Sequence, residues 1–391
     1  MAQSPSGLPP QSSMDQGSFL NGTESNWNNN ISLCVSNESV TNVTLPFYYP
    51  LPYVIISVIM GVIIFTVGFL GNLLVIVVVA RTKTMHSTTN CYLVSLALAD
   101  CLVLISATLP HTVGMFWAAN HFPYGTVCCA LLTFLNYLGI NASALSITAF
   151  TIERYIAICH PMKAHAMCTV SRAKKLIIGL WIFSIFYNSP WFGLTEIQVP
   201  TGDSSVLQVC TFKLDRGRYA AYYFVDLVLF YIIPLAVTAV LYCLIGRILF
   251  LSTNRGLAAD SIKRNTMKER VNKDRTSFKQ DMTRSRIQIV KMLVVVVVLF
   301  ALLWLPYRAL VVYNSFTDEE YLNIWFALFC RMMIFLNSAI NPILYNVMSV
   351  KFRTAFRRLL CERRYNHKES RAVEHTNMMT EHTEMCTLNA V

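Results

Sequence analysis

The sequence predicts an all-α membrane protein: a bundle of seven transmembrane helices followed by a short amphipathic eighth helix. Composition is the first observation, because 54% of the 391 residues are hydrophobic and only 14% are charged, whereas soluble domains contain about 25% charged residues. The second observation is a set of seven long apolar stretches, centred near residues 65, 102, 142, 184, 235, 300 and 335. Each has about 20 residues, enough to cross a bilayer as a helix whose backbone is hydrogen-bonded internally.

The distribution of basic residues predicts which side of the membrane each connection faces. Residues 1–50 contain no Lys or Arg, and the connections after the first, third and fifth stretches are basic. The positive-inside rule therefore places the N-terminus outside the cell and the C-terminus in the cytoplasm, as a multi-pass protein of the plasma membrane. The net charge of +11 is then a signal of topology, and we expect the lipid bilayer as a partner but no nucleic acid.

The chain divides into an N-tail, a bundle and a C-tail. Residues 1–50 form the predicted extracellular N-tail, and residues 51–348 form the bundle, with a basic third intracellular loop at about 252–285. Residues 349–361 form the amphipathic helix, and residues 362–391 form the cytoplasmic tail. Because the N-tail lacks the basic and apolar regions of a cleavable signal peptide, we expect the first span to act as the signal anchor. Asn-x-Ser/Thr sequons in the N-tail predict glycosylation at Asn21, Asn30, Asn37 and Asn42.

The cysteines can be sorted by the side of the membrane on which they are expected. Cys129 begins the third span on the outer side, and Cys210 is the single cysteine of the long second outer loop. A disulfide can form there because that side is oxidising. We favour the pair Cys129–Cys210, with Cys128 as the alternative partner of Cys210, and the states of Cys34 and Cys330 stay open.

The segment KFRTAFRRLLC after the seventh span ends at Cys361. Its aromatic residues and its basic residues lie on opposite faces of a helix, which is typical of a helix at the membrane interface. A cysteine at the end of such a helix is a predicted palmitoylation site. The alternative is a free cytosolic thiol.

Polar and ionisable side chains within the spans are costly and mark candidate functional sites. Asp100 lies in the middle of the second span. Residues with oxygen-bearing side chains that could surround it are Asn72, Ser143, Asn337, Ser338 and Asn341. Because hard cations prefer oxygen ligands, we expect a Na⁺ site around Asp100, with a hydrogen-bond network that holds no ion as the alternative. For Asp226 in span five and Arg308 in span six we favour a salt bridge over contact with a ligand.

The outer halves of spans three, six and seven contain the predicted ligand-binding residues. Tyr137 and Asn141 are four residues apart in span three, so they share one helix face. Span six contributes Tyr307 and Arg308, and span seven contributes Arg331. These phenol, amide and guanidinium groups donate hydrogen bonds and suit a ligand rich in carbonyl groups. The alternatives are that the tyrosines only pack and that Asn141 joins helices.

Short motifs occur in a fixed order along the seven spans. They are GNLLV with Asn72, LALAD with Asp100, ERY at 153–155, Trp181, Pro234 with Tyr242, FALLWLP at 300–306, and NPILY at 341–345. In these motifs the chain resembles the rhodopsin-like, or class A, G-protein-coupled receptors over about residues 50–361. The stretches NYLGINAS, SITAFTIERYIAICHP, FALLWLPYRALVV and FLNSAINP resemble more closely the thyrotropin-releasing hormone receptors. The chain departs from the wider family at Leu303, where a cysteine is usual, and at Arg286, where many members have an acid.

The resemblance implies a set of residues for G-protein coupling and activation: Glu153, Arg154, Tyr155, Tyr242, Trp304 and Tyr345. It implies that Glu153 holds Arg154 at rest, and that Arg154 turns toward the G protein and Tyr242 when the sixth span swings outward. Because Arg286 replaces the acid, no ion pair from span three to span six is expected. We therefore predict a weakly held resting state.

The resemblance also implies the ligand and the partners. The expected ligand is the tripeptide hormone pyroglutamyl-histidyl-prolinamide, with Tyr137 and Asn141 at the pyroglutamyl ring, Arg331 at the prolinamide end and Tyr307 packed on the ligand. The expected partners are a Gq-type G protein that acts through phospholipase C and calcium, together with arrestin and receptor kinases. A receptor of the same fold for another small peptide is the nearer alternative. A seven-helix transporter is the remote one, because no internal repeat is visible, and no enzyme motif, catalytic residue or further cofactor is predicted.

Overall fold

The computed structural model contains seven helices, among the residues it describes, that are long and apolar enough to cross a membrane, which confirms the predicted bundle. The described residues are 48–119, 121–199, 208–214, 216–263, 271–317, 321, 323–350 and 352–357. The predicted glycosylation sites, Cys34 and Cys361 lie outside these ranges.

The spans follow the apolar stretches in order. They are α1 (Leu51–Arg81), α2 with η3 and α3 (Thr88–Val103, Leu104–Thr108 and Leu109–Gly114), α4 (Gly125–Cys159), α6 with α7 (Val170–Asn188 and Trp191–Leu194), α8 with η4 and α9 (Arg216–Leu227, Val228–Ile232 and Ile233–Lys263), α10 (Val271–Phe316) and α11 (Ile324–Met348). The connections contain the short helices η2 (Lys83–Met85) and α5 (Pro161–Met167) and the strands β1 (Thr195–Gln198) and β2 (Val209–Phe212). Because α9 and α10 extend past the apolar stretches, much of the connection expected as a loop at about 252–285 is helical.

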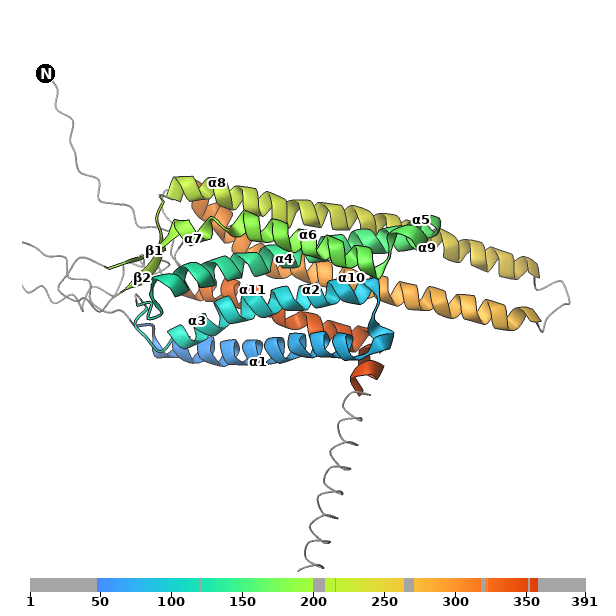
Figure 1. The fold of residues 1–391 in the computed structure, drawn as a ribbon, viewed down its shortest axis with the longest axis horizontal. Helices are drawn as coiled ribbons and strands as arrows, with labels where there is room; N and C mark the ends of the chain where they lie inside the picture. Colours follow the sequence, from blue (N-terminus) through green and yellow to red (C-terminus); the bar gives the residue numbers. More distant parts are fainter. Residues whose placement is uncertain are drawn as a thin grey trace, which may run out of the picture.

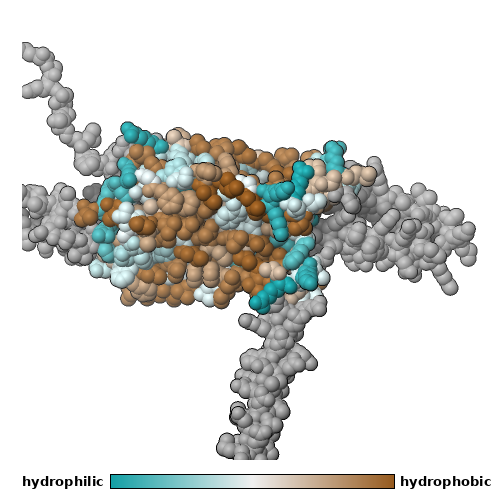
Figure 2. Space-filling model, viewed as in Figure 1, coloured by the Kyte–Doolittle hydropathy of each residue, from teal (hydrophilic) through white to brown (hydrophobic). Residues whose placement is uncertain are grey.

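The spans run side by side along the long axis of the molecule (Figure 1). Strands β1 and β2 lie at one end, which we call the hairpin end, and α5 lies at the opposite end together with the extensions of α9 and α10. On the face seen in Figure 2, hydrophobic residues cover the middle of the bundle and hydrophilic residues gather toward its two ends. This distribution fits a bundle whose middle is in contact with lipid hydrocarbon.

Two π-helical turns interrupt the second and fifth spans, which the sequence did not predict. Leu104–Thr108 ends two residues before Pro110, and Val228–Ile232 ends two residues before Pro234. Proline has no N–H to donate and collides with the preceding turn of a regular helix. The wider turn lets each span continue past its proline.

Small residues allow the helices to pack closely, as is usual in membranes. A Cβ atom at Gly139 of α4 would lie 2.8 Å from the carbonyl oxygen of Ala99 in α2. A Cβ atom at Gly68 of α1 would lie 2.8 Å from the Cβ of Ala339 in α11. Glycine at these two positions therefore sets how closely α1 approaches α11 and α2 approaches α4.

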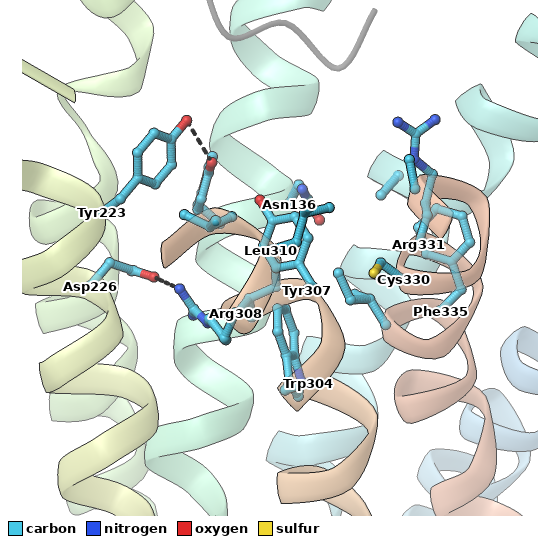
Figure 3. Close-up of a pocket in the computed structure, with 16 residues that line it drawn as sticks. Asn136, Tyr223, Asp226, Trp304, Tyr307, Arg308, Leu310, Cys330, Arg331 and Phe335 are labelled. Carbon is cyan, nitrogen blue, oxygen red and sulfur yellow. Dashed lines mark hydrogen bonds and ion pairs between the residues drawn. The ribbon is translucent and has the colours of Figure 1, made fainter. Parts of the chain in front are cut away.

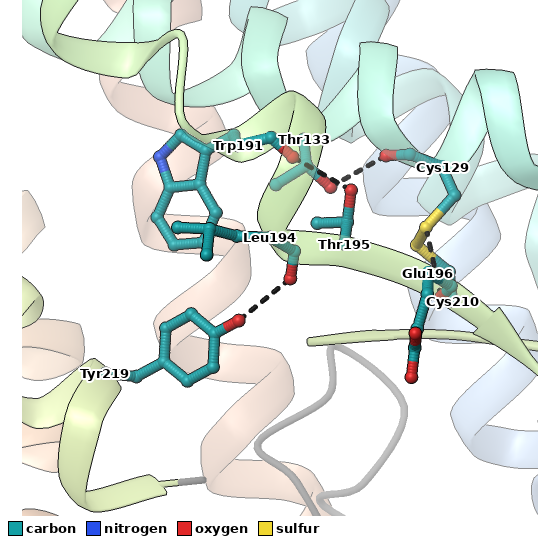
Figure 4. Close-up of a disulfide and its surroundings, with 8 residues drawn as sticks. All are labelled: Cys129, Thr133, Trp191, Leu194, Thr195, Glu196, Cys210 and Tyr219. Atoms are coloured by element: carbon teal, nitrogen blue, oxygen red, sulfur yellow. Dashed lines mark hydrogen bonds between the residues drawn. A yellow bond between two sulfur atoms is a disulfide. The ribbon is translucent and has the colours of Figure 1, made fainter. Parts of the chain in front are cut away.

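The predicted disulfide is present and fastens the hairpin to the bundle (Figure 4). Cys129 near the start of α4 is bonded to Cys210 of β2, with 5.7 Å between their Cα atoms, and β2 pairs antiparallel with β1. Below the hairpin, Tyr219 donates a hydrogen bond of 2.8 Å to the carbonyl oxygen of Leu194. Cys128 and Cys330 are free thiols, which resolves the alternative left open for Cys128.

The beginning of the predicted eighth helix lies within the described residues, and it is amphipathic as expected. Residues 350 and 352–357 are helical. Phe352 is buried, with its ring centroid 6.5 Å from that of Tyr345, whereas Arg357 is exposed. The apolar face of this segment thus packs against the end of α11.

Candidate functional site

A cavity of about 80 Å³ lies between α4, α8, α10 and α11 in the half of the bundle nearer the hairpin. Four of the five predicted ligand-binding residues line it: Tyr137, Tyr307, Arg308 and Arg331. Figure 3 shows Arg308 with Asp226 on one side of the cavity, Arg331 on the other side and Trp304 below. The structure therefore brings together side chains that are up to about two hundred residues apart in the sequence.

Tyr137 and Tyr307 are packed and also line the cavity. The Tyr137 ring stacks on Trp191 with centroids 4.4 Å apart, and its hydroxyl group lies 3.5 Å from the hydroxyl group of Tyr223. The Tyr307 ring meets the Trp304 ring edge-on at 6.2 Å. Aromatic neighbours thus fix both phenols, so packing and ligand contact are compatible roles for these residues.

Asn141 lies one turn deeper than Tyr137 and does not line the cavity. Its Nδ2 donates to the Oδ1 of Asn188 at 3.1 Å and to the Oδ1 of Asp226 at 3.1 Å. The residue is fully buried, with 0% of its surface exposed. Its amide joins spans three, four and five, as in the alternative that the sequence left open, and its predicted contact with the ligand stays a prediction.

The salt bridge between Asp226 and Arg308 is present, which confirms the favoured pairing. An Nη1 atom of Arg308 lies 2.9 Å from Oδ2 of Asp226, and the two side chains are 8% and 1% exposed. The Arg308 guanidinium group also lies 5.2 Å from the ring centroid of Trp304, at a distance typical of a cation–π contact. This pair links α8 to α10 on the wall of the cavity.

Arg331 lines a second cavity as well as the first. The second cavity, of about 150 Å³, lies under the hairpin, and its lining includes Tyr49, His111, Cys210 and Arg331. Burial raises the pKa of Tyr49 to about 12, against the opposing effect of the Arg331 charge. Tyr49 is therefore a neutral phenol at physiological pH. The two cavities share Arg331 and Ala107 as lining residues.

His111 is a site residue that sequence reasoning missed. Its Nδ1 lies 2.9 Å from Nη1 of Arg331, and its Nε2 lies 3.0 Å from Oγ of Ser57. The sequence could have identified it, because His111 is an ionisable side chain within an apolar span, which is the criterion by which Asp100 was chosen.

Several residues of the predicted polar cluster around Asp100 are in contact with one another. Asn341 donates from Nδ2 to Oδ2 of Asp100 at 2.8 Å. Asn72 donates from Nδ2 to the carbonyl oxygen of Ser338 at 2.8 Å. That carbonyl has no partner within the helix, because Pro342, four residues later, has no N–H to donate. Asn337 is buried beside them and contributes its own carbonyl oxygen to Asn341 at 3.4 Å.

Several buried oxygens of this cluster have no hydrogen-bond partner among the described residues. They are Oδ1 of Asp100 and Oδ1 of Asn72, and Oγ of Ser143, another predicted member, also has none. Buried polar atoms normally have partners. A carboxylate, an amide carbonyl and a hydroxyl oxygen form a donor set that suits a hard cation, so the residues present fit the expected Na⁺.

Of the residues predicted for activation, Trp304 lines the first cavity, and the others lie toward the end of the bundle opposite the hairpin. Glu153 and Arg154 form an ion pair with 2.7 Å between Oε1 and Nη2, which confirms the predicted pairing. The hydroxyl groups of Thr151 and Tyr242 lie 3.1 Å apart, linking α4 to α9, and Tyr155 contacts His160 at 3.4 Å. Two further activation residues, Trp304 and Tyr345, are buried, while the side chain of Arg286 lies outside the described part.

Comparison with known proteins gives the family. Residues 71–345 match the model of the 7 transmembrane receptor (rhodopsin family). The chain is 48% identical over 317 residues to the thyrotropin-releasing hormone receptor of Mus musculus, covering 79% of this chain and 80% of that protein. It is 45% identical over 348 residues to the thyrotropin-releasing hormone receptor of Gallus gallus, covering 87% and 85%.

A more distant relative is neuromedin-U receptor 2 of Mus musculus, which is 36% identical over 308 residues, covering 76% of this chain and 73% of that protein. The matched span begins one residue before Asn72 and ends at Tyr345, so it includes all the motifs on which the resemblance rests. The chain therefore belongs to the rhodopsin family of seven-transmembrane receptors, and it is a multi-pass membrane protein and a receptor rather than an enzyme.

Proposed function

We propose that this receptor binds thyrotropin-releasing hormone, pyroglutamyl-histidyl-prolinamide, and activates a Gq-type G protein, phospholipase C and calcium release. The relatives at 45–48% identity that bear this hormone in their names support the assignment. The observation on which it chiefly rests is the cavity in which Tyr137, Tyr307 and Arg331 meet. In this proposal the hairpin end is extracellular, as the distribution of basic residues indicates.

The chemistry of the cavity suits this ligand. Both ends of the hormone are blocked, so it presents carbonyl and amide groups but no ammonium and no carboxylate. Arginine offers only donors, and tyrosine can donate through its hydroxyl group. Among the described residues, Asp226 is the one acid that lines the cavity, and Arg308 neutralises it at 2.9 Å. A protonated amine would therefore find no unpaired carboxylate among these lining residues.

Each lining residue has a proposed role. Arg331 donates to the carbonyl group of the prolinamide end, Tyr137 donates to the pyroglutamyl ring, and Tyr307 packs on the ligand. Contact with Asn141, one turn deeper, requires the side chains above it to move as the hormone enters. Arg308 supports the wall through its salt bridge with Asp226.

Cavity size bears on how the hormone enters. The two cavities have volumes of about 80 and 150 Å³, whereas sites for ligands of drug size usually have about 300–1,000 Å³. We propose that the hormone fills both cavities, which share Arg331 and Ala107, and that the hairpin ends of the spans separate to admit it. Binding to this expanded arrangement in preference to the resting one would shift the population toward the active state.

In the active state, the end of the bundle opposite the hairpin would be exposed to a G protein. Glu153 pairs with Arg154 at 2.7 Å, and in this proposal that pair belongs to the resting state. Movement of α10 would free Arg154 to turn toward the G protein and Tyr242, after which receptor kinases and arrestin would act on the C-tail. We also propose that Na⁺ binds at Oδ1 of Asp100, where it would supply positive charge to the unpartnered oxygens of the cluster.

The first test is calcium release from cells that express the chain and are dosed with the hormone. The wild-type chain is expected to respond at nanomolar concentrations. Arg331→Lys is expected to shift the response at least about tenfold to higher concentration, because lysine keeps the charge but loses the planar fork of donors. If a chain shown to reach the cell surface gave no response, the hormone assignment would be wrong and other short peptides would have to be screened.

Replacing Arg286 with glutamate is expected to lower hormone-independent signalling. An acid at this position could pair with Arg154 and hold the sixth span in the resting arrangement, by about 1 kcal/mol or less for a partly exposed pair. Basal inositol phosphate accumulation, normalised to surface receptor, is the measurement. Arg286→Gln removes the cation without supplying an acid and is the control. Basal signalling as high in the glutamate variant as in the wild type would contradict the weakly held resting state.

A further inference from the structure

His111 has no role in the proposed function so far, yet it contacts the residue that joins the two cavities. It lies on α3, at the end of the second span nearer the hairpin. Its ring bridges Ser57 of α1 at 3.0 Å and Arg331 of α11 at 2.9 Å. Phe335 of α11 lies beside the ring, with centroids 5.7 Å apart. Groups on two other spans, α1 and α11, thus fix the plane of the imidazole.

The contact with Arg331 determines the protonation of His111. A guanidinium group has five N–H donors and no acceptor. The Nδ1 atom of His111, at 2.9 Å from Nη1 of Arg331, must therefore accept the hydrogen bond with its lone pair. Its proton is then on Nε2, which donates to Oγ of Ser57. His111 is in this arrangement a neutral imidazole in a single tautomer.

A neutral acceptor affects Arg331 differently from an acid. A carboxylate at this position would pair with the guanidinium group and cancel its charge, as Asp226 does for Arg308 at 2.9 Å. A neutral imidazole fixes the direction of one N–H bond of Arg331 and brings no negative charge of its own. Ser57, with 0% of its surface exposed, in turn holds the ring in the orientation that presents Nδ1.

We infer that His111 is a positioning residue for the ligand: its Nδ1 holds the Arg331 guanidinium group in one orientation at the junction of the two cavities. This inference rests on the proposed function, in which Arg331 meets the carbonyl group of the prolinamide end. Ser57 acts one step further from the ligand by fixing the tautomer of the imidazole.

Two amide substitutions distinguish the roles of the two ring nitrogens of His111. In His111→Asn the amide group occupies the position of Nδ1 and can still accept from Arg331. In His111→Gln the amide group occupies the position of Nε2, so it can contact Ser57 but leaves no acceptor for Arg331. A hydrogen bond to a charged group contributes about 1.5–3 kcal/mol, which corresponds to roughly tenfold or more in affinity.

The test measures hormone-stimulated calcium release and surface expression for these variants in the full-length chain. We expect His111→Asn to respond within about threefold of the wild type, and His111→Gln and His111→Ala to require at least about tenfold more hormone. In a chain that already has Arg331→Lys, adding His111→Gln should change the response by less than about threefold, because interacting residues are not additive.

The outcomes distinguish the inference from the function on which it rests. If the wild type responds but His111→Asn and His111→Gln are equally impaired or equally normal, the inference is wrong and the hormone assignment stands. The same holds if the fold-changes caused by the His111 and Arg331 substitutions multiply in the double variant. If the wild-type chain reaches the surface and ignores the hormone, both are wrong. A His111→Gln variant that reaches the surface poorly is compared by hormone binding per surface receptor, which a folding defect alone does not change.

Discussion

Replacing Cys129 with serine is expected to lower the free energy of unfolding by roughly 4–5 kcal/mol, since the chain-entropy model assigns that value to a disulfide closing a loop of this length. The bond joins residues separated by 81 positions in the sequence. Binding of the proposed hormone should fall as well, because Cys210 and Val209 of β2 line the second cavity. Without the bond, β2 is no longer covalently attached to α4 at the second cavity.

Thermal unfolding of the purified receptor and hormone binding at the cell surface measure these effects. Cys128→Ser is the matched control, because Cys128 is the adjacent cysteine and is free. It should melt at the wild-type temperature. Cys210→Ser and the double variant with Cys129→Ser should match the single variant, since either change removes the same bond. A loss in Cys128→Ser as large as that in Cys129→Ser would contradict the pairing.

Asp226→Asn is expected to destabilise the receptor by about 3–5 kcal/mol, because it leaves the charge of Arg308 buried and unpaired. Arg308 is only 7% exposed and Asp226 only 1%. The same change should weaken hormone binding, since both residues line the first cavity. The free energy of unfolding and the hormone concentration for half-maximal response are the two measurements.

A double-mutant cycle measures the interaction energy between Asp226 and Arg308. In the variant with both Asp226→Asn and Arg308→Gln no unpaired charge is left, so its loss should be smaller than the sum of the two single losses. Lys213→Gln is the control for removal of an exposed cation at the same end, and it should change stability by no more than about 0.5 kcal/mol. Additive losses would show that Asp226 and Arg308 stabilise the bundle independently.

The parts of the fold that depend on local composition could be predicted from the sequence. The spans follow from apolar stretches of sufficient length, since lipid allows few other structures. Glu153 and Arg154 are adjacent in the chain, so their pairing needs no knowledge of packing. The disulfide followed from sorting cysteines by side of the membrane, because Cys210 has few possible partners in an oxidising compartment.

The parts that depend on how helices are rotated and bent could not be predicted. Tyr137 and Asn141 share a helix face, yet only Tyr137 lines the cavity, because one turn deeper Asn188 and Asp226 close around the amide. The π turn at Leu104–Thr108 changes the phase of the helix shortly before His111. A regular period of 3.6 residues therefore cannot place His111, and its contact with Arg331 spans 220 positions.

The hydrogen bond from Asn72 to the carbonyl oxygen of Ser338, at 2.8 Å, has a consequence for how the chain is made. During translation α1 enters the membrane first and α11 last. Before α11 meets α1, the carbonyl oxygen that Pro342 leaves without a partner faces lipid, at a cost of roughly several kcal/mol. The newest span thus gains this hydrogen bond only when it docks on the oldest one, so Asn72 favours closure of the bundle at the end of synthesis. A nascent receptor that loses this amide would present an unfinished last span to the quality-control machinery, whatever ligand the mature protein binds.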